Sequence, residues 1–136
     1  FYQPPACDAA TPLFTDLAAS SPVWRGVGVL ARRGLVGGCQ SNEYCPSSNV
    51  PRDQMAVFAL ATREGTGYSP PACVAGSEIF ADLPASSPFC RWVEELARRG
   101  VVGGCGSGNY CPQDPVSRGE MSVFVAETFG LLVYGP

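Results

Sequence analysis

The sequence contains no histidine and no lysine, so all nine of its positive charges are arginines. Without an imidazole there is no histidine general base, and no Ser-His or Cys-His nucleophile pair can form. The adjacent Glu94 and Glu95 do not replace it, because neighbouring side chains on a helix diverge and cannot act as an acid/base couple across a substrate. We therefore expect a protein that is not an enzyme and that uses no cofactor.

An excess of positive charge and long hydrophobic runs are also missing. The net charge is −3 and the isoelectric point is about 4.8, whereas binding to nucleic-acid phosphates needs a cationic surface. No basic cluster is present to hold the chain on an anionic membrane, and the longest apolar runs, such as Met55 to Ala61, are far too short to cross a bilayer. These absences exclude a nucleic-acid partner and membrane insertion.

Cysteine, by contrast, is plentiful, with seven residues in 136. The cysteines lie beside Gly, Pro and Tyr in predicted loops rather than within apolar stripes, which is typical of disulfides formed in an oxidising compartment. Reduced, buried cysteines in a cytosolic protein are the alternative. Because the sequence starts at Phe1 rather than Met, we expect an extracellular or cell-surface protein that was exported by a signal peptide since removed.

The chain is a tandem repeat with a constant offset and no insertion. Pro4-Pro5-Ala6-Cys7 returns as Pro70-Pro71-Ala72-Cys73, an offset of 73 − 7 = 66 residues. The same offset relates the later motifs of the two halves. We expect one domain over residues 1–66 and a second over residues 67–136.

Each repeat is predicted to contain two helices joined by a stiff loop, so the expected fold class is mainly α. Ser21 and Ser87 each precede a proline and should cap the first helix, with the proline at the first helical position. Apolar residues then recur at helical spacing. Paired arginines suit the negative end of the helix dipole, and Gly34 or Gly100 can adopt the left-handed conformation that ends a helix.

The second helix of each repeat is predicted to begin after Pro51 or Ser117. In the second repeat Ser117 and Glu120 have the spacing of a capping box. Both helices are apolar on more than one side, and in the first repeat Ala56 and Leu60 add to the stripe that includes Met55. A helix that is buried on two faces needs a second partner, either the other repeat or another chain.

The cysteine spacing and the repeat favour three bridges that would brace the loops. The predicted disulfides are Cys39–Cys45, Cys105–Cys111 and Cys73–Cys90. The position equivalent to Cys90 is Trp24, which leaves Cys7 as a free thiol or an intermolecular bridge, while Cys7–Cys73 with Cys90 free is the competing pairing. A zinc site would have to be all-cysteine, with five residues between the paired ligands rather than the usual two to four, so we expect no metal.

The order of motifs in each repeat resembles the S-layer homology (SLH) family. Phe-x-Asp is followed by an amphipathic helix ending in Gly, a Gly-rich loop ending in aromatic-x-Pro, and an Arg that opens the second helix. The residues that carry the resemblance are Phe14-Thr15-Asp16, Gly34–Gly37, Tyr44-Cys45-Pro46 and Val50–Gln54, with Phe80-Ala81-Asp82, Gly100–Gly103, Tyr110-Cys111-Pro112 and Val116–Glu120. The cysteine-containing variant looks like a bacterial subgroup of the family.

The resemblance implies non-catalytic modules that attach exported surface proteins to cell-wall polysaccharide through grooves between repeats. Carried over to this sequence, the glycan-binding residues are Asp16, Arg52, Asp82, Arg118 and Glu120. The alternative is that each Arg pairs with the Asp of its own repeat and only fixes the loop. The chain also departs from the family, because it has two repeats rather than the usual three and its tryptophans lie elsewhere.

Two functions follow from these observations. The first is self-assembly into an extracellular filament or surface layer, since the second helices are apolar on two sides, Cys7 has no match, and the tail Leu131–Tyr134 is apolar. The chain's partner would then be itself. The alternative is an anchoring module that binds an acidic cell-wall polysaccharide.

Overall fold

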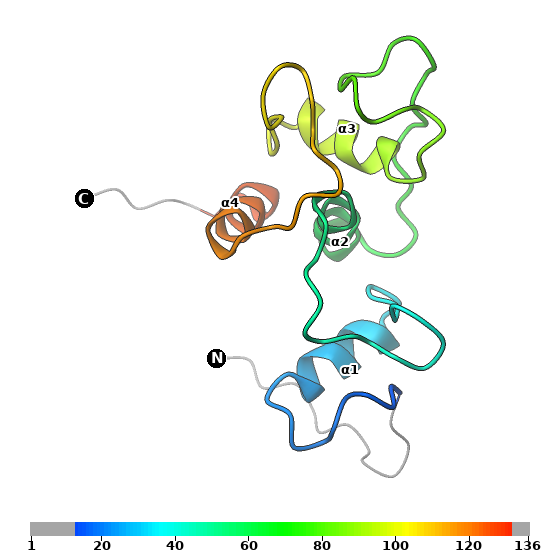
Figure 1. Cartoon of the computed structure of the whole chain (residues 1–136), viewed down its shortest axis with the longest axis vertical. Helices are drawn as coiled ribbons and strands as arrows, with labels where there is room; N and C mark the ends of the chain where they lie inside the picture. The colour runs from blue at the N-terminus through cyan, green and yellow to red at the C-terminus, as the bar shows by residue number, and fades with distance from the viewer. Residues whose placement is uncertain (1–12, 132–136) are drawn as a thin grey trace, which may run out of the picture. The chain divides into compact units, whose positions relative to one another are not determined.

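The computed structural model describes residues 13–131, and this part of the chain contains four helices joined by loops (Figure 1). The helices are α1 (Trp24–Arg32), α2 (Arg52–Glu64), α3 (Cys90–Arg98) and α4 (Arg118–Phe129). Within residues 13–131 the only β-type pairings are isolated bridges, such as the one between Pro51 and Pro115. The prediction of a mainly α protein with two helices per repeat and disulfide-braced loops is confirmed.

The first helix of each repeat begins two residues later than predicted. Ser21 is not the N-cap of α1, because the N–H of Trp24 donates to the backbone carbonyl of Ser21 at 3.1 Å and closes a tight turn before the helix starts. Ser87 and Cys90 form the same turn before α3, at 3.2 Å. The serine hydroxyls accept only long bonds from residues two positions on, at 3.4 and 3.3 Å. The tight i→i+3 turn therefore takes the place of a side-chain cap.

The second helices begin where the sequence predicts. α2 follows Pro51, and α4 follows Ser117, whose hydroxyl accepts from the N–H of Glu120 while the Glu120 carboxylate accepts from the N–H of Ser117. The predicted capping box is thus present. Gly34 and Gly100, after the first helices, have φ of 68° and 72°, the left-handed conformation expected of a terminating glycine.

The chain divides into two compact units between Ser48 and Asn49. Unit 1 contains α1 and a small core of Leu17, Trp24 and Val27, with Phe14 and Tyr44 partly buried against it. Trp24, which stands where the second repeat has Cys90, is therefore a core residue of this unit, 7% exposed.

Unit 2 contains α2, α3 and α4, and α2 lies between the other two helices (Figure 1). Its core joins Met55 and Leu60 of α2 to Val93 and Leu96 of α3 and to Phe124 of α4. The two apolar faces predicted for α2 are therefore both covered, by α3 and α4, and no other chain is required for this helix. The second helix of the first repeat packs on the first helix of the second repeat, so the contacts of unit 2 cross the 66/67 repeat boundary; the division of the sequence into domains 1–66 and 67–136 remains a prediction.

Candidate functional site

Three disulfides brace the described part of the chain. Their pairs are Cys39–Cys45, Cys73–Cys90 and Cys105–Cys111, with Cα–Cα distances of 5.9, 6.2 and 6.0 Å. They coincide with the pairs that the cysteine spacing favours, and the Cys73–Cys90 bridge rules out the competing Cys7–Cys73 pairing. Cys7 itself lies outside the described residues, so its free or intermolecular state stays a prediction.

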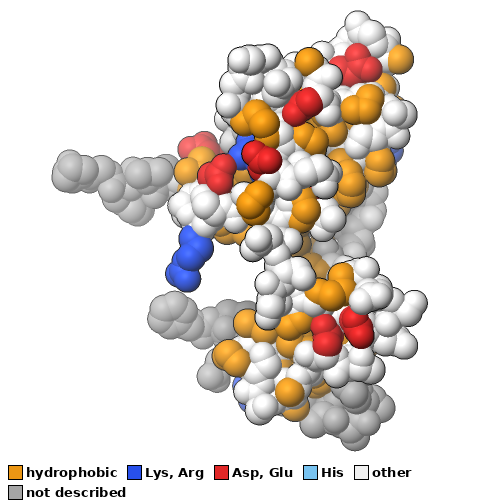
Figure 2. Space-filling view, in the orientation of Figure 1, with side chains coloured by type: hydrophobic (Ala, Val, Ile, Leu, Met, Phe, Trp, Pro, Cys, Tyr) orange, Lys and Arg blue, Asp and Glu red, His pale blue; other side chains and the backbone are white. Residues whose placement is uncertain are grey.

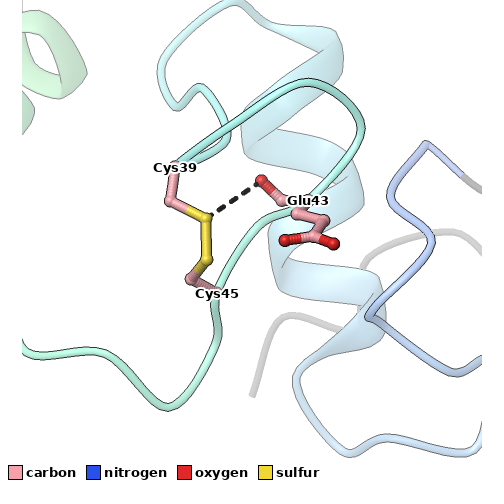
Figure 3. Close-up of side chains that lie close together, drawn as sticks. All are labelled: Cys39, Glu43 and Cys45. Carbon is pink, nitrogen blue, oxygen red and sulfur yellow. Dashed lines mark hydrogen bonds between the residues drawn. A yellow bond between two sulfur atoms is a disulfide. The ribbon is translucent and has the colours of Figure 1, made fainter.

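The loop closed by Cys39 and Cys45 is the first of two equivalent loops (Figure 3). The N–H of Cys39 donates to the carbonyl of Glu43 at 2.9 Å, and the Cys39 sulfur lies 3.5 Å from the same oxygen. Cys39, Glu43 and Cys45 are close enough together to hold a metal ion, as are Cys73, Cys90 and Glu94. In both groups the sulfurs are joined to each other, and a disulfide offers no thiolate to a metal.

Asp16 fixes the first disulfide loop from inside. Its two carboxylate oxygens accept hydrogen bonds from the backbone N–H of Tyr44 at 2.8 Å and of Cys45 at 2.7 Å. The bond from Tyr44, with a smaller contribution from Cys45, lowers the pKa of Asp16 despite some desolvation. The Asp of the Phe-x-Asp motif is thus a loop brace.

Asp82 does the same in the second repeat, accepting from the N–H of Tyr110 and of Cys111, both at 2.7 Å. The equivalent cysteines Cys45 and Cys111 have φ of 58° and 57°, a left-handed conformation that costs a residue with a side chain about 1 kcal/mol. The paired bonds to an aspartate and the disulfide together hold each cysteine in that conformation.

Arg52 is the first residue of α2 and is buried beneath the second loop. Its guanidinium donates to the carbonyl of Tyr110 at 3.1 Å, to the carboxylate of Glu120 at 2.7 Å and to the carbonyl of Gly103 at 3.4 Å. It also lies 4.9 Å from the centre of the Tyr110 ring, whose hydroxyl donates to the Arg52 carbonyl at 3.0 Å. Burial raises the pKa of the Tyr110 hydroxyl well above its usual value. Arg52 is therefore fixed by the other repeat, not by an Asp of its own.

Arg118, the equivalent residue of α4, has the opposite surroundings. Its side chain is exposed and forms no hydrogen bond or ion pair with any residue between 13 and 131. Glu120 is held by Ser117, whose N–H and then hydroxyl lower the pKa of its carboxyl, and by Arg52. Of the five predicted glycan-binding residues, only Arg118 has no partner among the described residues; whether any of the five binds glycan remains a proposal.

The sequence reasoning missed an acidic network on α3. Glu94 is 3% exposed and accepts from the N–H of Ile79 at 2.9 Å and from Arg98 at 2.6 Å. It ties the segment before α3 to the helix. The signal was available in the four-residue spacing from Glu94 to Arg98 and in the comparison of repeats, because the equivalent position in α1 is Gly28.

Glu95 extends this network to α2. It accepts from Arg99 at 2.8 Å and from the Tyr68 hydroxyl at 3.0 Å. Burial raises the pKa of Glu95, but the bonds from Arg99 and Tyr68 outweigh it, so the pKa lies below its usual value. Arg99 also reaches Glu64 of α2 at 2.5 Å. Both glutamates therefore hold α3 to the segments around it.

Two hollows lie on unit 2. One, of about 370 Å³, is lined by residues before and within α3, including Ser87, Arg91 and Trp92. The other is an apolar groove of about 540 Å³ along α4, lined by residues that include Arg118 and Val125. The groove thus brings the unpaired arginine beside an exposed apolar surface.

None of the helices in residues 13–131 has both the length and the hydrophobicity needed to cross a membrane.

A search of curated proteins found no match to the chain. The family model for the S-layer homology domain matches residues 13–56 and 79–122, two regions that contain both Phe-x-Asp motifs, both disulfide loops and the starts of α2 and α4. SLH domains are non-catalytic modules of cell-surface proteins, associated with surface layers or with anchoring to the cell wall, whose polysaccharide they bind. Because the two matches together cover more than half of the 136 residues, the chain belongs to the S-layer homology domain family.

Proposed function

We propose that this protein is a non-catalytic structural component of a bacterial cell surface that self-assembles into an extracellular filament or surface layer. The observation that carries the proposal is the outer face of α4. This helix packs on α2 and leaves large hydrophobic side chains exposed; they include Val125, Phe129 and, just after the helix, Leu131. Exposed apolar surface of this kind marks interaction sites in soluble proteins.

The sparse charge of the surface supports the same proposal. On the face drawn in Figure 2, hydrophobic side chains are frequent and charged ones are few. The net charge of −3 over 136 residues gives little electrostatic repulsion between copies. Three disulfides support an oxidising, extracellular location reached by export.

The mass of the particles, measured as a function of protein concentration, tests this proposal. Static light scattering and electron microscopy of the oxidised chain should show a mass that grows with protein concentration, and at the highest concentrations filaments or sheets. If the assemblies need the braced loops, reducing the disulfides should abolish them. Blocking free thiols without reducing the disulfides should leave the assemblies intact. A single monomeric mass over a hundredfold range of concentration would refute self-assembly.

Binding of an acidic cell-wall polysaccharide is the second candidate. It is favoured by membership of a family that binds such polymers and by the unpaired Arg118 at the N-terminus of a helix, where free backbone N–H groups also attract anions. Sedimentation with purified cell-wall polymer should then be lost in Arg118→Ala and kept in Arg25→Ala, a matched loss of one exposed helical arginine. Equal sedimentation of both variants would remove this candidate.

A further inference from the structure

The contact between α2 and α3 shows how the second helix of one repeat packs on the first helix of the next repeat. Five residues at helical spacing on one face of α2 are buried, none more than 9% exposed: Arg52, Met55, Ala56, Ala59 and Leu60. Arg52 anchors the contact at one end through Tyr110, and the aliphatic residues pack in one core with α3. A second helix thus has a receiving face for the first helix and disulfide loop that follow it in the sequence.

The equivalent face of α4 lines an open groove, although one of its residues, Met121, also packs against the core of unit 2. Adding 66 to the five positions of α2 gives five residues that all line the apolar groove of α4: Arg118, Met121, Ser122, Val125 and Ala126. The groove is therefore a receiving face whose occupant is absent among residues 13–131. Its arginine is exposed and unpaired where the equivalent Arg52 is buried with three acceptors.

Unit 1 carries the complementary surface. In the second repeat the residues that close over α2 are all buried: Phe80, Leu96, Val101 and Tyr110. Their equivalents in unit 1 are only half-buried: Phe14, Leu30, Leu35 and Tyr44. The loops themselves match, since the ring centres of Phe14 and Tyr44 are 5.2 Å apart, as are those of Phe80 and Tyr110. The greater burial in the second repeat therefore matches the cover that α2 gives to α3.

We infer that the groove of α4 is the docking site for α1 and the first disulfide loop of a second copy of this chain, with Arg118 inserted beneath Tyr44 as Arg52 lies beneath Tyr110. This inference rests on the proposed self-assembly and names its interface. The receiving face and the inserted surface are different, so the contact is heterologous and each copy offers one of each. Such a contact extends head to tail into a fibre.

The atomic expectations follow from the repeat. The Arg118 guanidinium donates to the carbonyls of Tyr44 and Gly37 of the second copy, and the Tyr44 hydroxyl donates to the Arg118 carbonyl. Two ion pairs of the internal contact have no counterpart, because Glu120 corresponds to Gln54 and Glu64 corresponds to Gly130. The contact between copies is therefore weaker than the one within the chain, and it is mainly apolar.

Two single substitutions test the interface. Val125→Asp places a charge in the groove, and Val123→Asp is the matched control, because Val123 is exposed on the same helix but does not line the groove. Leu30→Asp blocks the opposite surface on α1. Each interface variant should raise the dissociation constant of assembly at least a hundredfold, and Arg118→Ala at least tenfold, while Val123→Asp should match the wild type. Circular dichroism shows whether each variant is folded.

Mixing the variants identifies the occupant. Val125→Asp has an intact α1 surface and Leu30→Asp has an intact groove, so an equimolar mixture should form dimers of one copy of each, counted by native mass spectrometry. A mixture that stays monomeric beside an assembling wild type would overturn the inference in favour of an occupant from the same chain. Variants that assemble like the wild type would also overturn it, yet leave self-assembly standing through another surface. A wild type that never assembles refutes the proposed function itself.

Discussion

Arg52 and Arg118 occupy the same position in the repeat and differ in everything around them. Arg52 is buried, with its guanidinium shared between two carbonyls and a carboxylate, whereas Arg118 lies at the surface. The sequence assigned both to a glycan site because the motif around them is the same. What it could not show is burial, which depends on whether a following repeat covers the helix.

Substituting each arginine in turn should show the difference in stability between the buried and the exposed position. Arg52→Ala should lower the free energy of unfolding by about 2 kcal/mol, because it leaves the buried carbonyl of Tyr110 without a donor. Arg118→Ala should change the stability of the monomer by less than about 0.5 kcal/mol, as is usual for an exposed residue. Urea unfolding in dilute solution, where only monomers are present, measures both. Equal losses would mean that Arg118 is anchored within its own chain.

Asp16 gives unit 1 a sensitivity to acid. Its pKa is lowered in the folded protein from the usual 3.8, so its contribution to stability is complete above that value and is lost as the pH falls through the folded pKa. The wild type should therefore lose more stability between pH 6 and pH 2 than Asp16→Asn, which lacks this group. Unfolding of each protein in urea at several pH values gives the two curves. Every other carboxylate is common to both proteins, so curves of equal slope would show that Asp16 does not contribute.

At the scale of the helix, local chemistry decided what could be predicted. α4 begins at Arg118, as predicted, because the capping box is made by residues three positions apart, and the disulfide loops follow from short spacing in the sequence. α1 and α3 begin later than predicted because a backbone carbonyl, which every residue has, closes the turn that the serine hydroxyl was expected to cap. The partner of α2 could not be predicted, since an apolar face shows that a helix is covered but not by which element.

The bridge between Cys73 and Cys90 should be the main covalent support of α3. It spans 17 residues and ends in a buried sulfur, so replacing both cysteines with alanine should cost about 3 kcal/mol. The Cys39–Cys45 bridge closes a span of only 6 residues, so the same replacement there should cost about 1 kcal/mol less. Thermal unfolding of both double variants makes the comparison. A larger loss from the shorter loop would contradict a role for chain entropy and point to local packing.

At the scale of the whole molecule, the two units differ in how much core they have. Among the residues that the structure describes, unit 1 buries a core of three hydrophobic residues around one helix, whereas unit 2 packs three helices around one core. Small cores give little stability of their own, because the apolar area removed from water grows with the size of the unit. Unit 1 is therefore the part of the molecule that gains most from being covered.

Amide hydrogen exchange should record that difference. In dilute solution the amides of α1 should exchange faster than those of α2, since opening free energies follow the local core. On assembly, protection of α1 should rise at least tenfold while protection of α2 stays the same. Mass spectrometry of peptides from the two helices, at low and high protein concentration, provides the measurement, and Val125→Asp at high concentration is the control. Unchanged exchange of α1 in the assembled protein would place the contact elsewhere.

The offset pairing of α2 also sets an order of events during folding. The contacts that bury Arg52 join it to a residue 58 positions further along the chain, so the apolar faces of α2 stay uncovered until the second loop has folded. The loop of Cys39 and Cys45, whose ends are only 6 residues apart, closes sooner, because a short loop loses less entropy on closure. Folding chains thus pass through a stage in which α2 is exposed. At high protein concentration the α3 of a neighbouring chain can cover it instead, which gives exchanged products in place of correctly folded monomers.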